Sequence, residues 1–449
     1  MSNVSRLKGL SYAASDAAGQ LVFAVVSNYL LYFYTDVYGI PIGVAGTILL
    51  VARLIDGIDA PVWGMILDRT RSRWGKYRPW FLWLAGPYAI LGVLTFLSPD
   101  LSARGKVLYS AATYIALGIL YTGINTPVTA ILSTLTRDPS ERVVLTTYRM
   151  VGSKIGVLIV SAAALPLVSF LGGGNDKRGF MLTMPIFAAG AALAYLVAFR
   201  NLEEVVKPPS MPVRIFGMFG AMAGNWPWFI IAASSLFFWI AYVSRVSTAV
   251  YYFTYNLGRR DLVPLVNSLD VVSLTAVVFL PWLCRKTSKR NLWAAGLAGS
   301  IVGQFLMYAG SPSVPLVLGG WIVAAIAGGV AMTMPFSMLS DSVDYGEWKT
   351  GIRAAGLLTA VGAALCLKAG SGIGGALPAW IMSAHGYVPN AAQTPFSLAG
   401  IATGFLWLPA AFFALSLIPV LFYGRYEAME PRIAEQLRER SATVAIENN

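Results

Sequence analysis

Stretches of mainly apolar residues, each about 20 residues long, recur along the whole chain and constrain its fold more than any other feature. Short polar turns, many with Gly or Pro, separate them. Backbone inside a bilayer must satisfy its own hydrogen bonds, which leaves helices or closed barrels, and runs of this length are typical of helices. The sequence therefore predicts an all-α membrane protein with twelve spanning helices near 12–34, 40–67, 79–98, 106–133, 143–170, 180–199, 227–255, 263–284, 291–310, 315–340, 355–384 and 398–423.

The composition agrees with this interpretation. Hydrophobic residues make up 57% of the 449 and charged residues only 12%, about half the share found in soluble domains. Removing the apolar runs leaves no segment large enough for a soluble domain. The net charge of +12 lies mainly in short loops, where it orients helices, so nucleic acid is not an expected partner.

Few residues suit enzymatic chemistry. The two cysteines, Cys284 and Cys366, are far apart in apolar sequence and predict neither a disulfide nor a metal site. The one histidine, His385, follows the eleventh predicted helix and argues against a histidine proton relay. With no phosphate-binding glycine loop either, we expect no cofactor and no enzyme. Asp16 interrupts the first apolar run, which favours a retained helix over a signal peptide.

Loop charge predicts the topology. Basic residues cluster at 69–78 and 285–290, and the even helix count then puts both termini in the cytoplasm. The clusters occupy matching places in two halves of six helices, as in major facilitator transporters, whose substrate site lies between the halves. The expected divisions are an N-terminal bundle at 1–200, a cytoplasmic linker at 201–226, a C-terminal bundle at 227–423 and a cytoplasmic tail at 424–449. The tail is expected to form a surface helix with Ile433 and Leu437 on one side.

Three charged residues interrupt the second predicted helix. Arg53, Asp56 and Asp59 fall within a stripe of about 120° on an ideal helix, so all three can face the bundle interior. Each charge costs about 2.5–3.5 kcal/mol in a span, which makes such residues candidates for function. Two carboxylates a turn apart can hold a small cation or exchange a proton. A structural salt bridge between Arg53 and one aspartate is the alternative.

Other predicted helices carry polar residues too. Taken singly, each is about as well explained by a contact between helices, but together they predict a polar cavity. They are Asp16 and Gln20, Thr122 and Asn125, Arg149 and Lys154, Arg245, and Lys368.

Several motifs then reveal a family resemblance. The chain contains LSYAASDAAG, LYFYTDVYGI, VARLIDGIDAP, TRSRWGKYRPW, YTGINTP, VDYGEWKTGIR, LKAGSGIGG and GYVPN. Together they resemble the glycoside–pentoside–hexuronide cation symporters, the group of major facilitator proteins that includes the melibiose permease. The resemblance extends over nearly the whole chain, and TRSRWGKYRPW with DYGEWKTGIR is its most specific part.

The resemblance implies roles for individual residues. In the cation site, Asp56 matches a carboxylate ligand and Thr122 a nearby hydroxyl, while Asp59 is a further candidate. Lys368 matches a lysine that couples the cation and sugar sites. The matches to sugar contacts are Asp16, Arg149 and Asn125, with Gln20 a further candidate beside Asp16.

The chain also departs from the melibiose permease pattern. The second carboxylate, Asp59, lies one residue earlier, a rotation of about 100°, which leaves sodium and proton both open as the coupling ion. Asn125 replaces an aspartate and Thr129 an aromatic residue, which disfavours a melibiose-like galactoside. Arg245 has no counterpart; it either binds an anionic sugar such as a hexuronate, pairs with an acid, or reaches toward the outer interface.

Charged residues at the predicted cytoplasmic helix ends suggest gating. Paired charges there can close the cytoplasmic side and separate when it opens, although positive-inside topology alone also supplies such residues. The candidates are Asp68, Arg69 and Arg73 after the second helix, and Asp344, Glu347 and Arg353 after the tenth.

These observations together predict a monomeric, inner-membrane symporter that couples a sugar, glycoside or hexuronide to Na⁺ or H⁺ by alternating access. No metal is expected beyond a possible Na⁺ at Asp56. The alternatives are a lipid or lysolipid carrier of the same fold and a membrane sensor that transports nothing.

Overall fold

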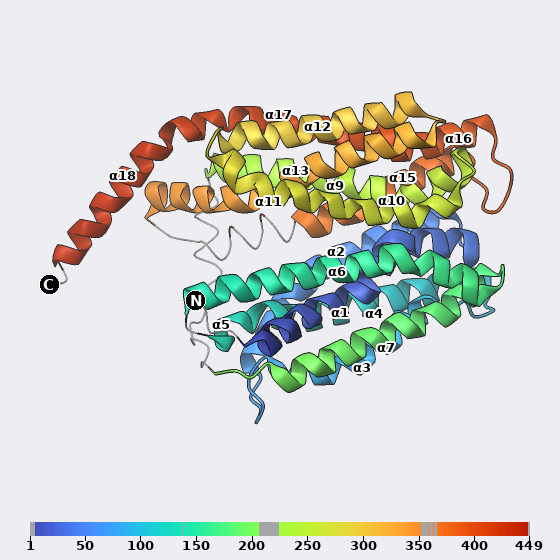
Figure 1. The fold of residues 1–449 in the computed structure, drawn as a ribbon, viewed down its shortest axis with the longest axis horizontal. Helices are drawn as coiled ribbons and strands as arrows, with labels where there is room; N and C mark the ends of the chain where they lie inside the picture. The colour runs from blue at the N-terminus through green and yellow to red at the C-terminus, as the bar shows by residue number, and fades with distance from the viewer. Residues whose placement is uncertain are drawn as a thin grey trace. The chain divides into compact units, whose positions relative to one another are not determined.

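A computed structural model describes residues 5–136, 138–205, 224–351, 358, 362 and 366–447 (Figure 1). All regular secondary structure in these residues is helical, which confirms the predicted fold class. Within the same residues, nine helices are long and apolar enough to cross a membrane. The predicted count of twelve spans stays a prediction.

Residue contacts divide the chain into two compact units. Unit 1 comprises Met1–Ser210, Val246–Ser268 and Gly375–Ala402, and unit 2 comprises Met211–Arg245, Leu269–Gly374 and Thr403–Asn449. Two segments from the second half of the sequence thus pack with the first half. The domain boundaries predicted from the sequence divide the chain by helix order, whereas these units divide it by contacts. The predicted boundaries therefore also stay a prediction.

Unit 1 is built mainly from the first seven helices, with α1 at its centre. Helix α1 packs on α4, α6 and α7, and these long helices run alongside one another in Figure 1. The unit also holds the end of α9 (Trp226–Tyr251), η2, η3, most of α10, the end of α15 (Cys366–Ala384), and α16. The bounds are α1 Arg6–Tyr32, η1 Phe33–Val37, α2 Ile42–Arg69, α3 Arg78–Thr95, α4 Ala103–Ala130, α5 Leu132–Leu135, α6 Pro139–Gly172, α7 Asp176–Asn201, η2 Tyr252–Asn256, η3 Arg260–Leu262, α10 Val263–Leu269 and α16 Pro395–Ala402.

Unit 2 contains the remaining helices, with α12 and α13 as its most closely packed pair. Helices α9 and α15 begin in this unit and end in unit 1. The bounds are α9 Trp226–Tyr251, η4 Asp270–Val272, α11 Ser273–Cys284, α12 Lys289–Gly310, α13 Val314–Thr350, α15 Cys366–Ala384, η6 Thr403–Trp407, α17 Leu408–Phe422 and α18 Gly424–Glu447.

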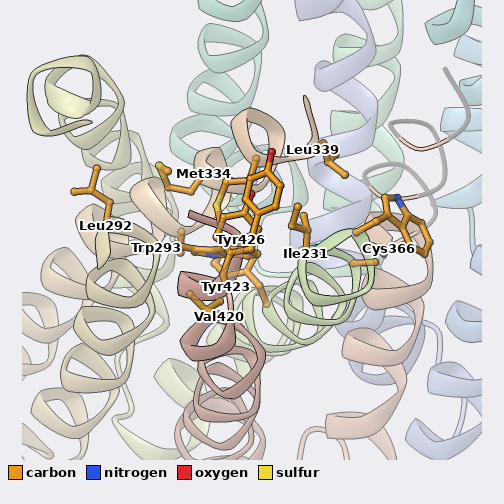
Figure 2. Packing of buried hydrophobic residues seen from close by; sticks show 14 of the residues in the cluster. Ile231, Leu292, Trp293, Met334, Leu339, Cys366, Val420, Tyr423 and Tyr426 are labelled. Atoms are coloured by element: carbon orange, nitrogen blue, oxygen red, sulfur yellow. The ribbon is translucent and has the colours of Figure 1, made fainter. Parts of the chain in front are cut away.

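The core of unit 2 lies where the last helices meet α12 and α13. Trp293 and Met334 are fully buried there, beside Tyr423 and Tyr426 (Figure 2). On α18, Ile433 is buried and Leu437 packs against the same cluster. The expectation of a tail helix with both residues on one side is therefore confirmed, and its apolar side is bound to the core of unit 2.

Polar side chains fix the starts of several helices. Ser102, Asn175 and Ser288 precede α4, α7 and α12, and each accepts a hydrogen bond from a backbone N–H in the first turn. These bonds satisfy donors that a helix start leaves without intrahelical partners. The turn residues between apolar runs thus set these helix boundaries.

Candidate functional site

The charged residues of α2 form a buried ion pair. A guanidinium nitrogen of Arg53 lies 3.0 Å from Asp56 Oδ2. Asp56 is 4% exposed, and the Arg53 guanidinium lies 4.9 Å from the centre of the Phe23 ring on α1. The pair neutralises two charges that would each be costly alone in a span. The structure therefore contains the salt bridge that the sequence offered as an alternative role for Arg53. Asp56 can bind a cation only if Arg53 shares the carboxylate with that cation or releases it.

Helix α4 approaches the Asp56 carboxylate closely. A Cβ at Gly118 would overlap an Asp56 oxygen, so a larger residue there would displace the carboxylate from its present position. Thr122 lies one turn further along α4 and is buried. Residues four apart share one helix face, so the structure supports placing Thr122 on the face that meets Asp56. Asp59 follows Asp56 by three residues on α2 and is half-buried.

A second polar cluster joins α1, α4 and α6. Arg149 on α6 donates to Thr129 Oγ1 on α4 at 3.1 Å. The Asp16 carboxylate on α1 interacts with the Arg149 charge and with the Ser153 hydroxyl. Three predicted sugar-site helices thus meet at this cluster. Ser153 was missed from the sequence, where it looks like an ordinary helix-packing serine one turn after Arg149.

Helices α1 and α6 come close enough for this cluster because of small residues. A Cβ at Gly156 would lie 2.8 Å from the Ala17 carbonyl oxygen and 2.9 Å from Gln20 Cβ. Gln20 therefore lies against α6, one turn from Asp16. Asn125 is half-buried on α4, and its backbone carbonyl oxygen accepts a hydrogen bond from the Thr129 hydroxyl at 3.3 Å. Lys154 is also half-buried on α6.

Two aromatic residues connect the clusters. Tyr121 stacks on Phe23 with ring centres 4.4 Å apart, and Phe23 in turn contacts Arg53. Tyr121 also lies within electrostatic reach of both charged pairs, Asp16 with Arg149 and Arg53 with Asp56. Sequence reasoning missed both residues because aromatic side chains in an apolar run look like core.

Arg245 lies in unit 2 as a buried cation paired with an acid. It is 1% exposed, and its Nη2 lies 4.0 Å from Asp270 Oδ1. The guanidinium lies 4.7 Å from the Trp321 ring centre, and the Tyr242 hydroxyl donates to Asp270 at 3.0 Å. These contacts match the alternative in which Arg245 pairs with an acid. Lys368 is half-buried near the start of α15, also in unit 2, and its coupling role stays a prediction.

The structure describes only some of the predicted gating residues. Arg69 ends α2 and is exposed, and the Arg73 guanidinium lies 4.4 Å from the Trp74 ring centre. Asp344 and Glu347 lie on α13. Arg353 and the side chain of Asp68 fall outside the described part of the chain, so the gating assignment stays a prediction.

Two other charged contacts were missed at these helix ends. Glu204 accepts hydrogen bonds from the backbone N–H groups of Tyr77 and Arg78, at 2.6 and 2.9 Å. Asp341 on α13 binds Lys289 on α12 at 2.8 Å, and Lys289 also reaches Glu430 on α18 at 3.1 Å. No sequence spacing links these residues, because the partners lie 50 to more than 100 positions apart.

Known proteins resemble the chain over most of its length. Residues 11–424 match the family described as MFS/sugar transport protein. The isoprimeverose transporter of Lactiplantibacillus pentosus is 40% identical over 96% of this chain and 91% of its own. The chain belongs to this family of transporters. A putative glycoside/cation symporter of Escherichia coli K12, YagG, is 31% identical over 98% of this chain and 97% of its own.

Solved structures agree on the fold. A bacterial homolog of the human lysosomal transporter Spinster superposes with a TM-score of 0.69 at 14% identity, covering 95% of this chain and 97% of that one. A D-xylose–proton symporter superposes with a TM-score of 0.67 at 18% identity, covering 92% and 96%. At such identities the likeness concerns the fold alone. The expected major facilitator fold, the sugar-symporter resemblance and the assignment as a membrane transporter rather than an enzyme are confirmed.

Proposed function

We propose that this protein is a cation-coupled symporter that moves a neutral sugar or glycoside across the bacterial inner membrane. One observation carries the proposal: the pair Arg53–Asp56 and the cluster around Asp16 and Arg149 lie next to each other in one compact unit, joined through Tyr121. An ion site and a sugar site must communicate in a symporter, and adjacency provides the shortest route. Relatives named as a glycoside/cation symporter and an inner membrane symporter support the class and the location.

The sugar site contains Asp16, Gln20, Asn125 and Arg149, and the family resemblance adds Lys368 as a further candidate. Carboxylate, amide and guanidinium groups bind sugar hydroxyls as donors and acceptors. The charge of Arg149 is balanced by Asp16 and that of Arg245 by Asp270, so no cation in these pairs is left over for an anionic sugar. We therefore place Arg245 outside the sugar site. The substrate named for the 40% identical relative, isoprimeverose, is the first compound to test.

The cation site contains Asp56, Asp59 and Thr122, and its ion is Na⁺ or H⁺. In the structure Arg53 pairs with Asp56. An ion that binds Asp56 competes with Arg53, and displaced Arg53 changes its contact with Phe23 and so with Tyr121. Sugar and ion then raise each other's affinity by the same factor, as linkage requires. Lys368 would further tie the two sites across the cycle.

The chain is oriented in the membrane by its loop charges. Both termini lie in the cytoplasm because the basic loops at 69–78 and 285–290 stay on that side. Charged residues at those helix ends, Asp68, Arg69, Arg73, Asp344, Glu347 and Arg353, act in gating. The protein works as a monomer.

Transport by purified protein in liposomes tests the proposal. We expect uptake of labelled isoprimeverose to be driven by either a sodium or a proton gradient, each applied alone. Counterflow without any gradient separates a transporter from a sensor, because a sensor gives no exchange. Exchange of labelled lysolipid in place of every sugar tried would refute sugar symport and favour the lipid carrier.

A further inference from the structure

Asp36 lies in the π-helix η1 and is a hub of hydrogen bonds inside unit 1. It is 8% exposed. Its carboxylate accepts hydrogen bonds from Thr35 at 2.6 Å, from Tyr387 at 2.8 and 2.9 Å, and from Tyr255. Its backbone oxygen accepts a further bond from Asn390 at 2.6 Å. A buried carboxylate is costly without such donors, so these contacts depend on one another.

The donors come from two distant parts of the sequence. Tyr255 lies in η2, after α9, and Tyr387 and Asn390 lie in the loop after α15. Burial raises the pKa of the Tyr387 hydroxyl above its ordinary value, so it stays a donor at physiological pH. Asp36 thus joins both segments of the second sequence half that pack in unit 1.

A second polar contact lies beside the hub. Arg260 in η3 binds Asp176 at the start of α7, with 2.6 Å between Nη2 and Oδ2, and the Tyr32 hydroxyl donates to the same oxygen at 2.9 Å. A pocket of about 400 Å³ is lined by residues of both contacts, including Asp36, Asp176 and Arg260. Water can therefore reach the groups that would lose their partners if the segments separated.

The division of the helices shows where separation would occur. Helix α9 passes from unit 2 to unit 1 after Arg245, and α15 passes after Gly374. Each helix therefore has one end packed with its own sequence half and the other end held by the Asp36 contacts. Polar bonds to a single carboxylate can be replaced by water, whereas a wide apolar interface cannot be opened at so small a cost.

From these contacts we infer that Asp36 is a further residue of the transport reaction, the hub of a latch that holds Val246–Ser268 and Gly375–Ala402 against α1 and must open in each cycle. The inference rests on the proposed transport function. The latch consists of Asp36, Thr35, Tyr255, Tyr387 and Asn390. Its role is to position these segments, without contact to sugar or ion.

Labelling of a buried cysteine tests the latch directly. Val250 is 0% exposed on α9 inside unit 1, so a Val250→Cys reporter in a Cys284→Ser background reports opening. In purified full-length protein we expect Asp36→Asn to raise the rate of maleimide labelling at position 250 about tenfold, a shift of about 1.4 kcal/mol in the opening equilibrium. Tyr255→Phe and Tyr387→Phe each remove one of the hydroxyl donors to Asp36 and should raise the labelling rate less.

Two controls separate latch opening from general loosening. Asp261→Asn changes an exposed aspartate near Tyr255 that binds only Arg259 among the contacts described, and it should leave the rate unchanged. Native Cys366 in unit 2 is buried and should label no faster in the latch variants. The inference is overturned if Asp36→Asn and both tyrosine variants label at the Asp261→Asn rate, or if Cys366 accelerates as much as position 250.

Transport gives the second readout. We expect Asp36→Asn to keep sugar binding within about twofold while net uptake falls about tenfold, since a structural defect alone would reduce both together. The labelling assay needs neither sugar nor ion. If the unmodified protein transports no sugar, the proposed function is refuted. The labelling rates at position 250 still test the latch independently of that result.

Discussion

At the scale of single residues, the ion pair of α2 has the largest consequences. The three charged residues of this span were expected either to bind a cation or to form a salt bridge. In the structure Arg53 and Asp56 are paired at 3.0 Å. A pair of this kind is compatible with ion coupling, because an ion can replace the arginine on the carboxylate. Stability and function would then use the same contact in different states of the cycle.

Neutralising Asp56 should uncouple sugar from ion. In Asp56→Asn the ion loses its main ligand, so the rise in sugar affinity caused by the ion, typically about 5–150-fold for coupled ligands, should disappear. Sugar binding with and without ion, together with accumulation under an ion gradient, measures this. Asp100→Asn, at an exposed site, should behave like the unmodified protein. Continued accumulation by Asp56→Asn would exclude Asp56 from the ion site.

Replacing Arg245 should lower stability and leave neutral-sugar transport intact. Arg245→Met removes one partner of a buried pair, which should cost about 2–3 kcal/mol, less than a fully enclosed pair because Asp270 is partly exposed. Arg245→Met with Asp270→Asn should lose less stability than Arg245→Met alone. Thermal unfolding in detergent and the KM for sugar are the measurements. A KM raised more than about tenfold in stably folded protein would return Arg245 to the sugar site.

At the scale of helices, close approach between α1 and α6 decides whether the sugar-site residues meet. Asp16 and Gln20 lie on one helix and Arg149 on the other, and the contact depends on Gly156. Sequence periodicity indicates which residues share a face of one helix. Which faces meet depends on small residues whose importance is visible only once the partner helix is in place.

Adding a methyl group at this contact should therefore damage the site. A Cβ in Gly156→Ala would lie 2.8 Å from the Ala17 carbonyl oxygen, and since backbone cannot move aside, we expect a loss of about 1–3 kcal/mol and weaker sugar binding. Gly86→Ala on α3 is the matched control, because its Cβ would meet no atom within 4 Å. Equal behaviour of the two variants in thermal unfolding and sugar binding would contradict this explanation.

The tail helix α18 offers a test in unit 2. Asp341 accepts bonds from Lys289 and from the Tyr423 hydroxyl, and Lys289 also binds Glu430 of α18. Asp341→Asn loses the charge-assisted bond to Lys289 and should destabilise unit 2 by about 1–3 kcal/mol. Glu435→Gln on the exposed side of α18 should not. Thermal unfolding compares them; a lowered midpoint for Glu435→Gln alone would disprove the assignment.

At the scale of the whole molecule, contacts group the chain differently from its sequence. The two six-helix halves predicted from the sequence follow the order of the helices, whereas unit 1 includes Val246–Ser268 and Gly375–Ala402 from the second half of the chain. Helices α9 and α15 therefore contribute to both units. Parts of a helix that belong to different units are natural places for a transporter to change its contacts during a cycle.

Sequence reasoning gave the class of protein and most of the candidate residues. Apolar run length predicted the helices, and motif resemblance predicted the family, the sugar-site residues on α1, α4 and α6, and the cation candidates Asp56 and Thr122. It missed Tyr121, Ser153, Glu204 and the Asp36 hub. Tyrosine and serine are common in apolar helices for packing reasons, so their chemical role becomes visible only through their neighbours.

The sequence by itself determined that the chain spans a membrane as helices, because backbone hydrogen bonding in lipid leaves few alternatives. Its motifs, which resemble those of cation symporters, indicated transport rather than catalysis. Only the tertiary structure decided which partners the buried charged groups meet. Arg53 pairs with Asp56 rather than Asp59, Arg245 pairs with Asp270, and Asp36 accepts hydrogen bonds from tyrosines more than 200 residues away. The physical reason is that a buried charge must find its partner in space, and sequence distance says nothing about which partner that is.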